Sequence, residues 1–195
     1  MTRCLVVVEH PRPDSLTRAA LERVLAGLDA AGHEVRLIDL DNEQFDPRLT
    51  AFEQQHHIGD PNDRPYLADH ADALRWAQRI VLVYPTWFSG QPARLKGWID
   101  RTWMHQVAFE LPADSSRIRA KLWNVRRLDI VTSHGSSRLV NLVQGNGGRL
   151  IVFRTLRLLC HPLCRTSFTA IYKIDRQAPE ACTEWLDRVE RRFAR

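Results

Sequence analysis

The chain has 195 residues, of which 44% are hydrophobic and 26% charged, and its formal net charge is +5. Both fractions are near the averages of globular proteins, which argues against a disordered chain or a fibre. A chain of this length builds one domain with a sizeable core, so we expect residues 1–195 to form a single domain.

The positive charge comes almost entirely from arginine, because Lys96, Lys121 and Lys173 are the only lysines. The basic residues are scattered apart from a group near the C-terminus, whereas nucleic-acid-binding proteins usually cluster them. We therefore expect no nucleic acid as a partner. The C-terminal group is interpreted as the solvated face of a helix, and it consists of Arg188, Arg191, Arg192 and Arg195.

The apolar run nearest the start, Cys4–Val8, is shorter than the core of a secretory signal, which takes about 7–15 residues. No run approaches the roughly 18 apolar residues of a membrane-spanning helix. We therefore expect a cytoplasmic protein without a membrane span.

In chain order, the β-branched run Cys4–Val8 predicts a strand that is buried on both faces. Apolar residues then recur at helical spacing over residues 16–28, with Asp14 or Ser15 placed to cap a helix. A second strand is predicted at residues 34–39. A strand, a helix and a strand in so short a stretch form a βαβ unit, whose two strands are parallel.

Residues 40–70 are polar and interrupted by prolines, which predicts a long surface excursion. The elements predicted after it are a helix at 71–77, a strand at 80–84, a helix at 92–103, an excursion at 104–122, a strand at 128–131, a helix at 150–159, a strand at 166–174 and a helix at 180–194. The alternation predicts an α/β fold, a doubly wound sandwich with a five-stranded parallel sheet and helices on both faces. Ligands of such sheets bind outside the carboxyl ends of the strands, so function is expected in the loops there.

The loop after the first strand lacks the G-x-G-x-x-G fingerprint of dinucleotide-binding folds. Ser15 and Thr17 place hydroxyls beside the free amides of a helix start, where anions bind readily, and His10 adds potential positive charge. Ordinary helix capping uses the same residue types, so phosphate binding and capping both remain open. Asp39, at the end of the second strand, is interpreted as a turn residue.

The loop after the third strand carries two adjacent aromatic residues, Trp87 and Phe88, which cannot both point into the core. A planar ligand lying along this loop would use its amides as donors and the rings as a wall. Exposed aromatic side chains otherwise indicate a protein interface. Trp98 and Trp103, in the helix that follows, are expected to be packing residues.

The stretch Pro85–Arg101 resembles the signature of the flavodoxin-like NAD(P)H dehydrogenases (quinone), a family that includes bacterial quinone reductases and ancillary proteins of potassium efflux. The similar pattern has Pro, an aromatic pair, Pro-Ala, Leu-Lys and Trp at matching spacings. The first loop, with His10 and then Ser15, is also similar to the start of that family.

The resemblance implies a homodimer that binds FAD or FMN non-covalently and transfers hydride from NAD(P)H through the flavin to a quinone-like acceptor. The family's cofactor-binding loops match three sets of residues in this sequence. These are His10, Ser15, Leu16 and Thr17 for the phosphates, Pro85, Thr86, Trp87 and Phe88 for the flavin ring, and Thr132, Ser133, His134 and Gly135 for its other edge.

The fourth loop departs from the family pattern, because Thr132–Ser137 replaces the frequent Thr-Thr-Gly-Gly. Some members use a Tyr and a His to manage charge on the reduced flavin, and no Tyr lies between Tyr84 and Tyr172. His134 is therefore the catalytic candidate, with Arg138 as an electrostatic alternative. The glycine-rich segment at 144–149 is either a mobile lid or a flexible turn.

Two other functions are weighed against this one. A flavin-binding regulatory or ancillary subunit, as in potassium efflux systems, would use the exposed aromatics and the arginines to dock on an acidic partner. A metal hydrolase would use His56, His57, Asp60 and His70. Adjacent histidines seldom both reach one ion, and neither those residues nor the cysteines have zinc-site spacing, so we expect no metal.

Overall fold

The computed structural model describes residues 1–112 and 117–195. Its main sheet contains β1 (Arg3–Val8), β2 (Glu34–Asp39), β3 (Arg79–Pro85), β6 (Arg127–Ser133) and β7 (Arg165–Ile171). These five strands are parallel and lie in the order β2-β1-β3-β6-β7. The predicted doubly wound sheet is confirmed, and the direction of winding reverses between β1 and β3.

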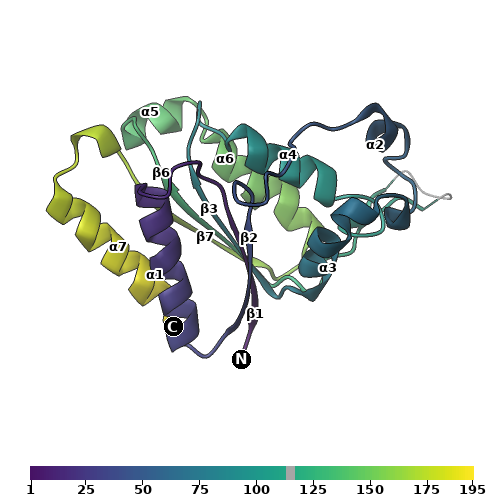
Figure 1. Ribbon diagram of the computed structural model, residues 1–195, viewed down its shortest axis with the longest axis horizontal. Coiled ribbons are helices and arrows are strands. Elements are labelled where there is room, and N and C mark those ends of the chain that lie inside the picture. The colour runs from purple at the N-terminus through teal and green to yellow at the C-terminus, as the bar shows by residue number, and fades with distance from the viewer. Residues whose placement is uncertain (113–116) are drawn as a thin grey trace.

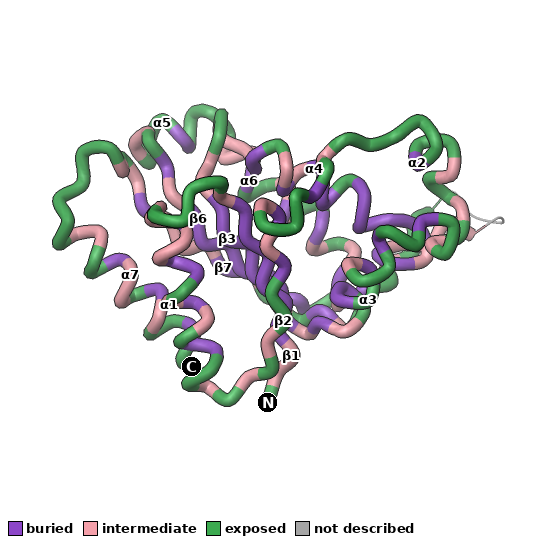
Figure 2. The backbone as a smooth tube through the Cα atoms, viewed as in Figure 1, coloured by how far each residue is buried: buried purple, intermediate pink, exposed green. Residues whose placement is uncertain are grey.

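Helices cover both faces of the sheet (Figure 1). On one face α1 (Leu16–Ala30) packs against α7 (Pro179–Phe193), and the other face carries α3 (Ala68–Trp76) and α4 (Ala93–Thr102). Alternate residues of β1 serve the two layers, because Leu5 and Val7 join one core cluster while Val6 and Val8 join the other. The central strands β1, β3 and β6 are buried on both sides, as Figure 2 shows, whereas the edge strands β2 and β7 are partly exposed.

The predicted helix at 150–159 and the predicted strand at 166–174 have different boundaries in the structure. The helix expected at 150–159 begins earlier, as α6 (Gly147–Leu150), and continues as a π turn (Ile151–Thr155) and a 3-10 turn (Leu156–Leu159). β7 ends at Ile171 rather than at 174, because Lys173 takes a left-handed φ of 55° that an extended strand cannot continue through.

The two excursions that the sequence predicts as loops contain short helices, 3-10 turns and strands. The excursion at 40–70 contains α2 (Ala51–Gln55) and 3-10 turns at Pro61–Asp63 and Pro65–Leu67. The second excursion contains a hairpin of β4 (Phe109–Glu110) and β5 (Arg119–Ala120), and its residues 113–116 lie outside the described part. α5 (Arg138–Val143) and a 3-10 turn at Ile174–Arg176 complete the list. Within the described part of the chain, no helix is both long and apolar enough to cross a membrane.

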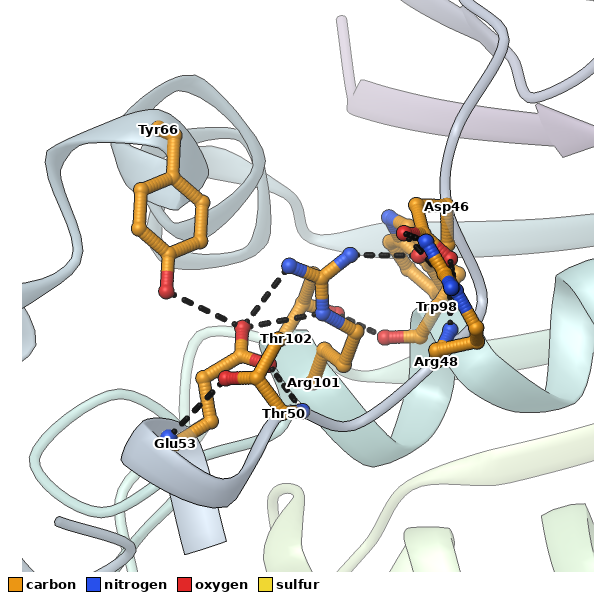
Figure 3. Close-up of polar contacts among 8 residues, drawn as sticks. All are labelled: Asp46, Arg48, Thr50, Glu53, Tyr66, Trp98, Arg101 and Thr102. Carbon is orange, nitrogen blue, oxygen red and sulfur yellow. Dashed lines mark hydrogen bonds and ion pairs between the residues drawn. The ribbon is translucent and has the colours of Figure 1, made fainter.

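A buried ion pair attaches the excursion at 40–67, which we call the strap, to α4 (Figure 3). The guanidinium of Arg101 donates to Oε1 of Glu53 from Nε at 2.9 Å and from Nη2 at 2.8 Å, and Tyr66 Oη donates to the same oxygen at 3.2 Å. Thr50 and Glu53 form a capping box at the start of α2, and the Thr50 amide donates to Oε2 of Glu53 at 2.8 Å. The strap is therefore attached to the last turn of α4, the helix that follows the β3 loop.

Close backbone packing strengthens this attachment. A Cβ atom at Gly97 would lie 2.3 Å from the carbonyl oxygen of Pro47, so only glycine lets α4 and the strap approach this closely. Trp98 and Trp103 are buried in the same core cluster, which confirms that they are packing residues.

The Glu53–Arg101 pair makes a prediction for stability. Burial raises the pKa of Glu53, but the bonds from Arg101 and Thr50 outweigh it and hold that pKa below its ordinary value. The E53Q variant leaves a buried guanidinium unpaired and should lower the free energy of unfolding by about 3 kcal/mol at pH 7. Urea denaturation measures this loss.

The pH dependence has a definite sign. A lowered native pKa gives stability that is present above the ordinary glutamate pKa and lost as the pH falls through the native value, so the wild type and E53Q should converge in acid. D100N, which breaks the exposed Lys96–Asp100 pair on the same helix, is the control and should cost under about 1 kcal/mol. Equal losses in the two variants would contradict the assignment.

Candidate functional site

The loops that follow β1, β3 and β6 meet at one edge of the sheet, because these three strands are neighbours. The Glu9 amide, just past β1, donates to the Val83 carbonyl oxygen of β3 at 3.1 Å. The Thr86 amide, just past β3, donates to the Ser133 carbonyl oxygen of β6 at 2.9 Å. The structure therefore brings the three predicted sets of site residues to a single edge.

The first loop ends in the N-terminus of α1. Ser15 is its N-cap, and its Oγ accepts from the Arg18 amide at 3.2 Å, so capping is what the structure shows for this hydroxyl. The amides of Leu16 and Thr17 have no acceptor in the described part of the chain. His10 Nδ1 accepts from the amide two residues on at 3.1 Å, and burial together with neighbouring guanidinium groups lowers the pKa of His10. The free amides leave room for an anion at this helix start.

Arg18 fixes the shape of the first loop from inside α1. Its guanidinium pairs with Asp39 at the end of β2 and donates to the His10 carbonyl oxygen at 2.9 Å. Asp39 Oδ1 also accepts from the amides of Asp41 and Asn42, at 3.2 and 3.1 Å. Asp39 is thus the turn residue that the sequence predicts.

The second loop is a tight turn in which Trp87 and Gly90 exchange backbone hydrogen bonds of 3.1 and 2.8 Å. The two central residues, Phe88 and Ser89, have φ values of 43° and 61°, in the left-handed region that bulky side chains avoid. The Phe88 ring is fully exposed and Trp87 is 62% exposed, so neither ring fills the core. Of the amides expected to face a ligand, that of Trp87 is used inside the turn, whereas those of Phe88 and Ser89 have no acceptor among the described residues.

The glycine-rich segment holds this turn in place. The Gly148 amide donates to the Ser89 carbonyl oxygen at 2.7 Å, and Gln91 Nε2 donates to the Gly148 carbonyl oxygen at 2.8 Å. A Cβ atom at Gly148 would lie 3.2 Å from the Tyr84 hydroxyl, so the backbone passes close to the end of β3. Ser89 Oγ also donates to Oε1 of Gln144. The segment therefore forms a turn and the first turn of α6, pinned to the β3 loop.

The third loop is supported by buried side chains. Thr132 and His134 are almost completely buried, and Thr86 Oγ1 lies 2.9 Å from Oγ1 of Thr132 and 3.5 Å from Nε2 of His134. Ser133 and Gly135, between and after them, are closer to the surface. Burial lowers the pKa of His134, and its Nδ1 has no partner in the described structure. The lowered pKa favours the neutral form of the ring, although the nearby Asn141 side chain opposes this shift.

His134 stacks on Tyr172, a residue that the sequence analysis did not connect with the site. The two ring centroids are 4.7 Å apart and the ring planes differ by 14°. Each residue follows the end of its own strand, and β6 and β7 are neighbours in which Ser133 pairs with Ile171. The equivalent positions after two adjacent parallel strands were the signal that could have identified this pair.

The residues considered for a metal do not converge. His56 stacks on Phe52, whereas His70 Nδ1 accepts from Trp98 Nε1 at 3.3 Å on the inner side of the strap. Among the described residues, no group of three or more His, Cys, Asp or Glu side chains is arranged to hold a metal ion.

Comparison with known proteins places this architecture. A family model described as "Flavodoxin-like fold" matches residues 2–150, which is more than half of the chain. The chain belongs to the flavodoxin-like fold family. The resemblance stated for Pro85–Arg101 is thereby confirmed at the level of the family.

A ribosyldihydronicotinamide dehydrogenase-like protein of Penicillium crustosum is 30% identical in an alignment 130 residues long, which covers 59% of this flavodoxin-like chain and 49% of that protein. The chain spans about half the length of the curated relatives it matches.

Two solved structures share the fold. An NAD(P)H:quinone oxidoreductase of Methanothermobacter marburgensis, 20% identical, gives a TM-score of 0.81 over 99% of this chain and 98% of that one. An FMN-dependent NADH-azoreductase of Bacillus anthracis, in complex with FMN, is 14% identical and gives 0.74 over 100% and 98%.

The left-handed turn at Phe88 predicts how a substitution there changes the stability of the cofactor-free protein. Phe88 packs against nothing, and Asn tolerates its φ far better than Phe does. F88N should therefore raise the free energy of unfolding of the cofactor-free protein by about 1 kcal/mol. Urea denaturation tests it, with Trp123→Asn, at another exposed aromatic, as the control without a gain. A clear loss of stability in F88N would show that the Phe88 ring supports the fold.

Proposed function

We propose that this protein is a flavin-dependent NAD(P)H:quinone oxidoreductase that holds FAD or FMN at the edge formed by the three loops. The observation that carries the proposal is the turn at Phe88 and Ser89, whose strained backbone presents two free amides and an exposed ring. Strain of this kind persists mainly at functional sites. The names of the relatives, a dehydrogenase-like protein, a quinone oxidoreductase and an FMN-dependent azoreductase, support the same activity.

The donors of the first loop fit the phosphate of a flavin nucleotide. The amides of Leu16 and Thr17 are free and stand at the positive end of the α1 dipole. His10 and Ser15 border them, although the Ser15 hydroxyl already accepts the capping bond. These four residues would hold the phosphate.

The β3 loop fits the ring system. Pro85 ends the strand, and the Thr86 amide that follows it is bonded to the end of β6. Trp87 provides an aromatic wall, and the amide of Phe88 provides a donor. The loop at Thr132–Gly135 would border the ring from the β6 side. When bound, the flavin would accept hydride from NAD(P)H and pass it to a quinone-like acceptor.

The task of the protein is then to bind, orient and neutralise charge. The buried His134 supports the loop, because its Nε2 lies 3.5 Å from Thr86 Oγ1 and its ring stacks on Tyr172. Arg138 begins α5 next to this loop and contributes positive charge. We propose that these side chains stabilise the negative charge of the reduced flavin.

Cofactor binding and turnover test the function. The purified protein should carry or take up FAD or FMN, seen by visible absorption, and should oxidise NAD(P)H in the presence of a quinone. W87A should weaken flavin binding at least about tenfold, because one stacking surface is lost. W123A, at an exposed Trp that neighbours His161, should bind normally. A protein that binds neither flavin would refute the proposal.

We also propose that the working form is a homodimer. α5 exposes Leu139, Leu142 and Val143 on one face, and Val143 is 81% exposed. The Ser89–Gln144 hydrogen bond joins the end of this helix to the aromatic turn. Apolar side chains and two aromatic rings therefore lie together at the proposed flavin site, and a second copy would cover them.

Light scattering tests the dimer. The wild type should have twice the chain mass of 22.6 kDa, and V143E should shift it toward one chain because a carboxylate cannot be buried in an apolar interface. L163E, at a comparably exposed position away from α5, should remain a dimer. A flavin-loaded wild type with the mass of a single chain would exclude this form, and equal dissociation of both variants would exclude this interface.

A further inference from the structure

β7 is the edge strand of the main sheet, and one side of it pairs with nothing in the described structure. The Arg165 amide donates to the Arg126 carbonyl oxygen, and the Ile171 carbonyl oxygen accepts from the His134 amide, so both residues face β6. Parallel pairing alternates along a strand, and the backbone groups of Thr166, Phe168 and Ala170 therefore point away from the sheet. The N–H and C=O groups of these three alternate residues are therefore unpaired along this edge in the described structure.

The open edge forms the floor of a trough. A cavity of about 990 Å³ lies between α5, the helical segment at 147–159 and α7, with Thr166, Phe168 and Ala170 among its lining residues. A second cavity of about 450 Å³ continues along α7 and shares Phe168 and Ala170 with the first. The two cavities follow the strand where an added backbone would lie.

The trough is strongly cationic, although its arginines come from distant parts of the sequence. The lining residues of the two cavities include no Asp or Glu. Their arginines are Arg138, Arg149, Arg188, Arg191, Arg192 and Arg195. None of these six forms an ion pair in the described part of the chain, whereas Arg18, Arg79 and Arg101 elsewhere are paired.

Two of the arginines are positioned on opposite sides of β7. The Arg149 guanidinium lies over Phe153 and Phe168, 5.2 and 5.6 Å from the ring centroids. Arg192 Nε donates to Oγ of Ser167 at 3.3 Å. Since Ser167 and Phe168 are adjacent in the strand, their side chains point to opposite faces, and so the two charges flank the open backbone.

We propose that the β7 edge binds an extended acidic peptide segment of a partner protein, which adds to the sheet as a further strand. Its backbone would pair with Thr166, Phe168 and Ala170, and its carboxylates, on both faces of the strand, would meet Arg149 and Arg192. The wall of the trough adjoins the proposed flavin site, because it includes Arg138 and Tyr172. The backbone that would pair, at Thr166, Phe168 and Ala170, belongs to neither the proposed flavin site nor the proposed dimer face, and the proposal does not depend on flavin binding.

Charge and backbone hydrogen bonding together favour an acidic peptide over a second copy of the chain or a nucleic acid. A second copy of the chain would bring its own arginines against these ones, which is repulsive. A nucleic acid satisfies the arginines but offers no strand backbone to the open donors and acceptors. Charged side chains also protect sheet edges from aggregation, and in that case the arginines would bind no peptide.

The test uses the full chain and a blocked, fluorescently labelled peptide of about eight residues in which pairs of Glu alternate with Val, so that Glu lies on both faces of a strand. Fluorescence anisotropy should show saturable binding that weakens with salt. The same peptide with alternate amide nitrogens methylated keeps its charge but cannot pair along one edge, and it should bind at least tenfold more weakly.

Protein variants separate charge from backbone pairing. R149Q and R192Q should each weaken binding at least tenfold, whereas R154Q, an equal charge change at a residue that lines neither cavity, should not. A170P removes an outward amide without touching the ladder to β6, and should abolish binding with its melting temperature nearly unchanged. The methylated peptide provides the same information if A170P does not fold.

Three results would overturn the proposal. No saturable binding would mean that the arginines protect the edge and nothing more. Equal binding of the methylated peptide, or unchanged binding by R149Q and R192Q, would mean that strand addition in this trough does not occur. Tighter binding of a single-stranded DNA oligonucleotide than of the peptide would make the trough a polyanion surface.

Discussion

The proposed site depends on a backbone turn that its own side chains disfavour. Phe88 and Ser89 take left-handed φ values between a rigid strand end and the start of α4, and nothing in the turn packs to compensate. Such a conformation survives because its surroundings impose it. The bonds from Gly148 to the turn, and from Thr86 to the end of β6, provide that constraint.

The rest of the fold can be understood as support for this turn. The Glu53–Arg101 pair and the close packing of Gly97 on Pro47 attach the strap to α4, the helix that follows the turn. The order β1-β3-β6 places a helix N-terminus on one side of the turn and the His134–Tyr172 stack on the other. Donors for an anion, a flat aromatic wall and a buried imidazole ring thus lie along one edge of the sheet.

Much of this arrangement could be predicted from the sequence. Continuous β-branched runs such as Cys4–Val8 predict buried parallel strands, and the alternation with helices predicts the layers. The motif from Pro85 to Arg101 indicates the family and the loop. The Thr50 and Glu53 capping box was also readable, but α2 spans so few residues that helical periodicity cannot reveal it.

Other features arise only in three dimensions. Tyr172 lies far from His134 in the sequence and reaches it because β7 is the neighbour of β6. The positive φ of Phe88 has no sequence signature, since Gly and Asn are the residues that normally announce it. The arginines of the β7 trough appear scattered along the chain, and the C-terminal ones, expected to be a solvated face, join Arg138 and Arg149 around one strand edge.

The most direct test of the central claim is amide hydrogen exchange at Phe88 and Ser89, followed residue by residue by NMR with and without FMN or FAD. The account predicts fast exchange in the free protein, because these amides have no acceptor in the described structure, and marked protection of the Phe88 amide when flavin binds. Flavin binding that leaves both amides exchanging as before would contradict it.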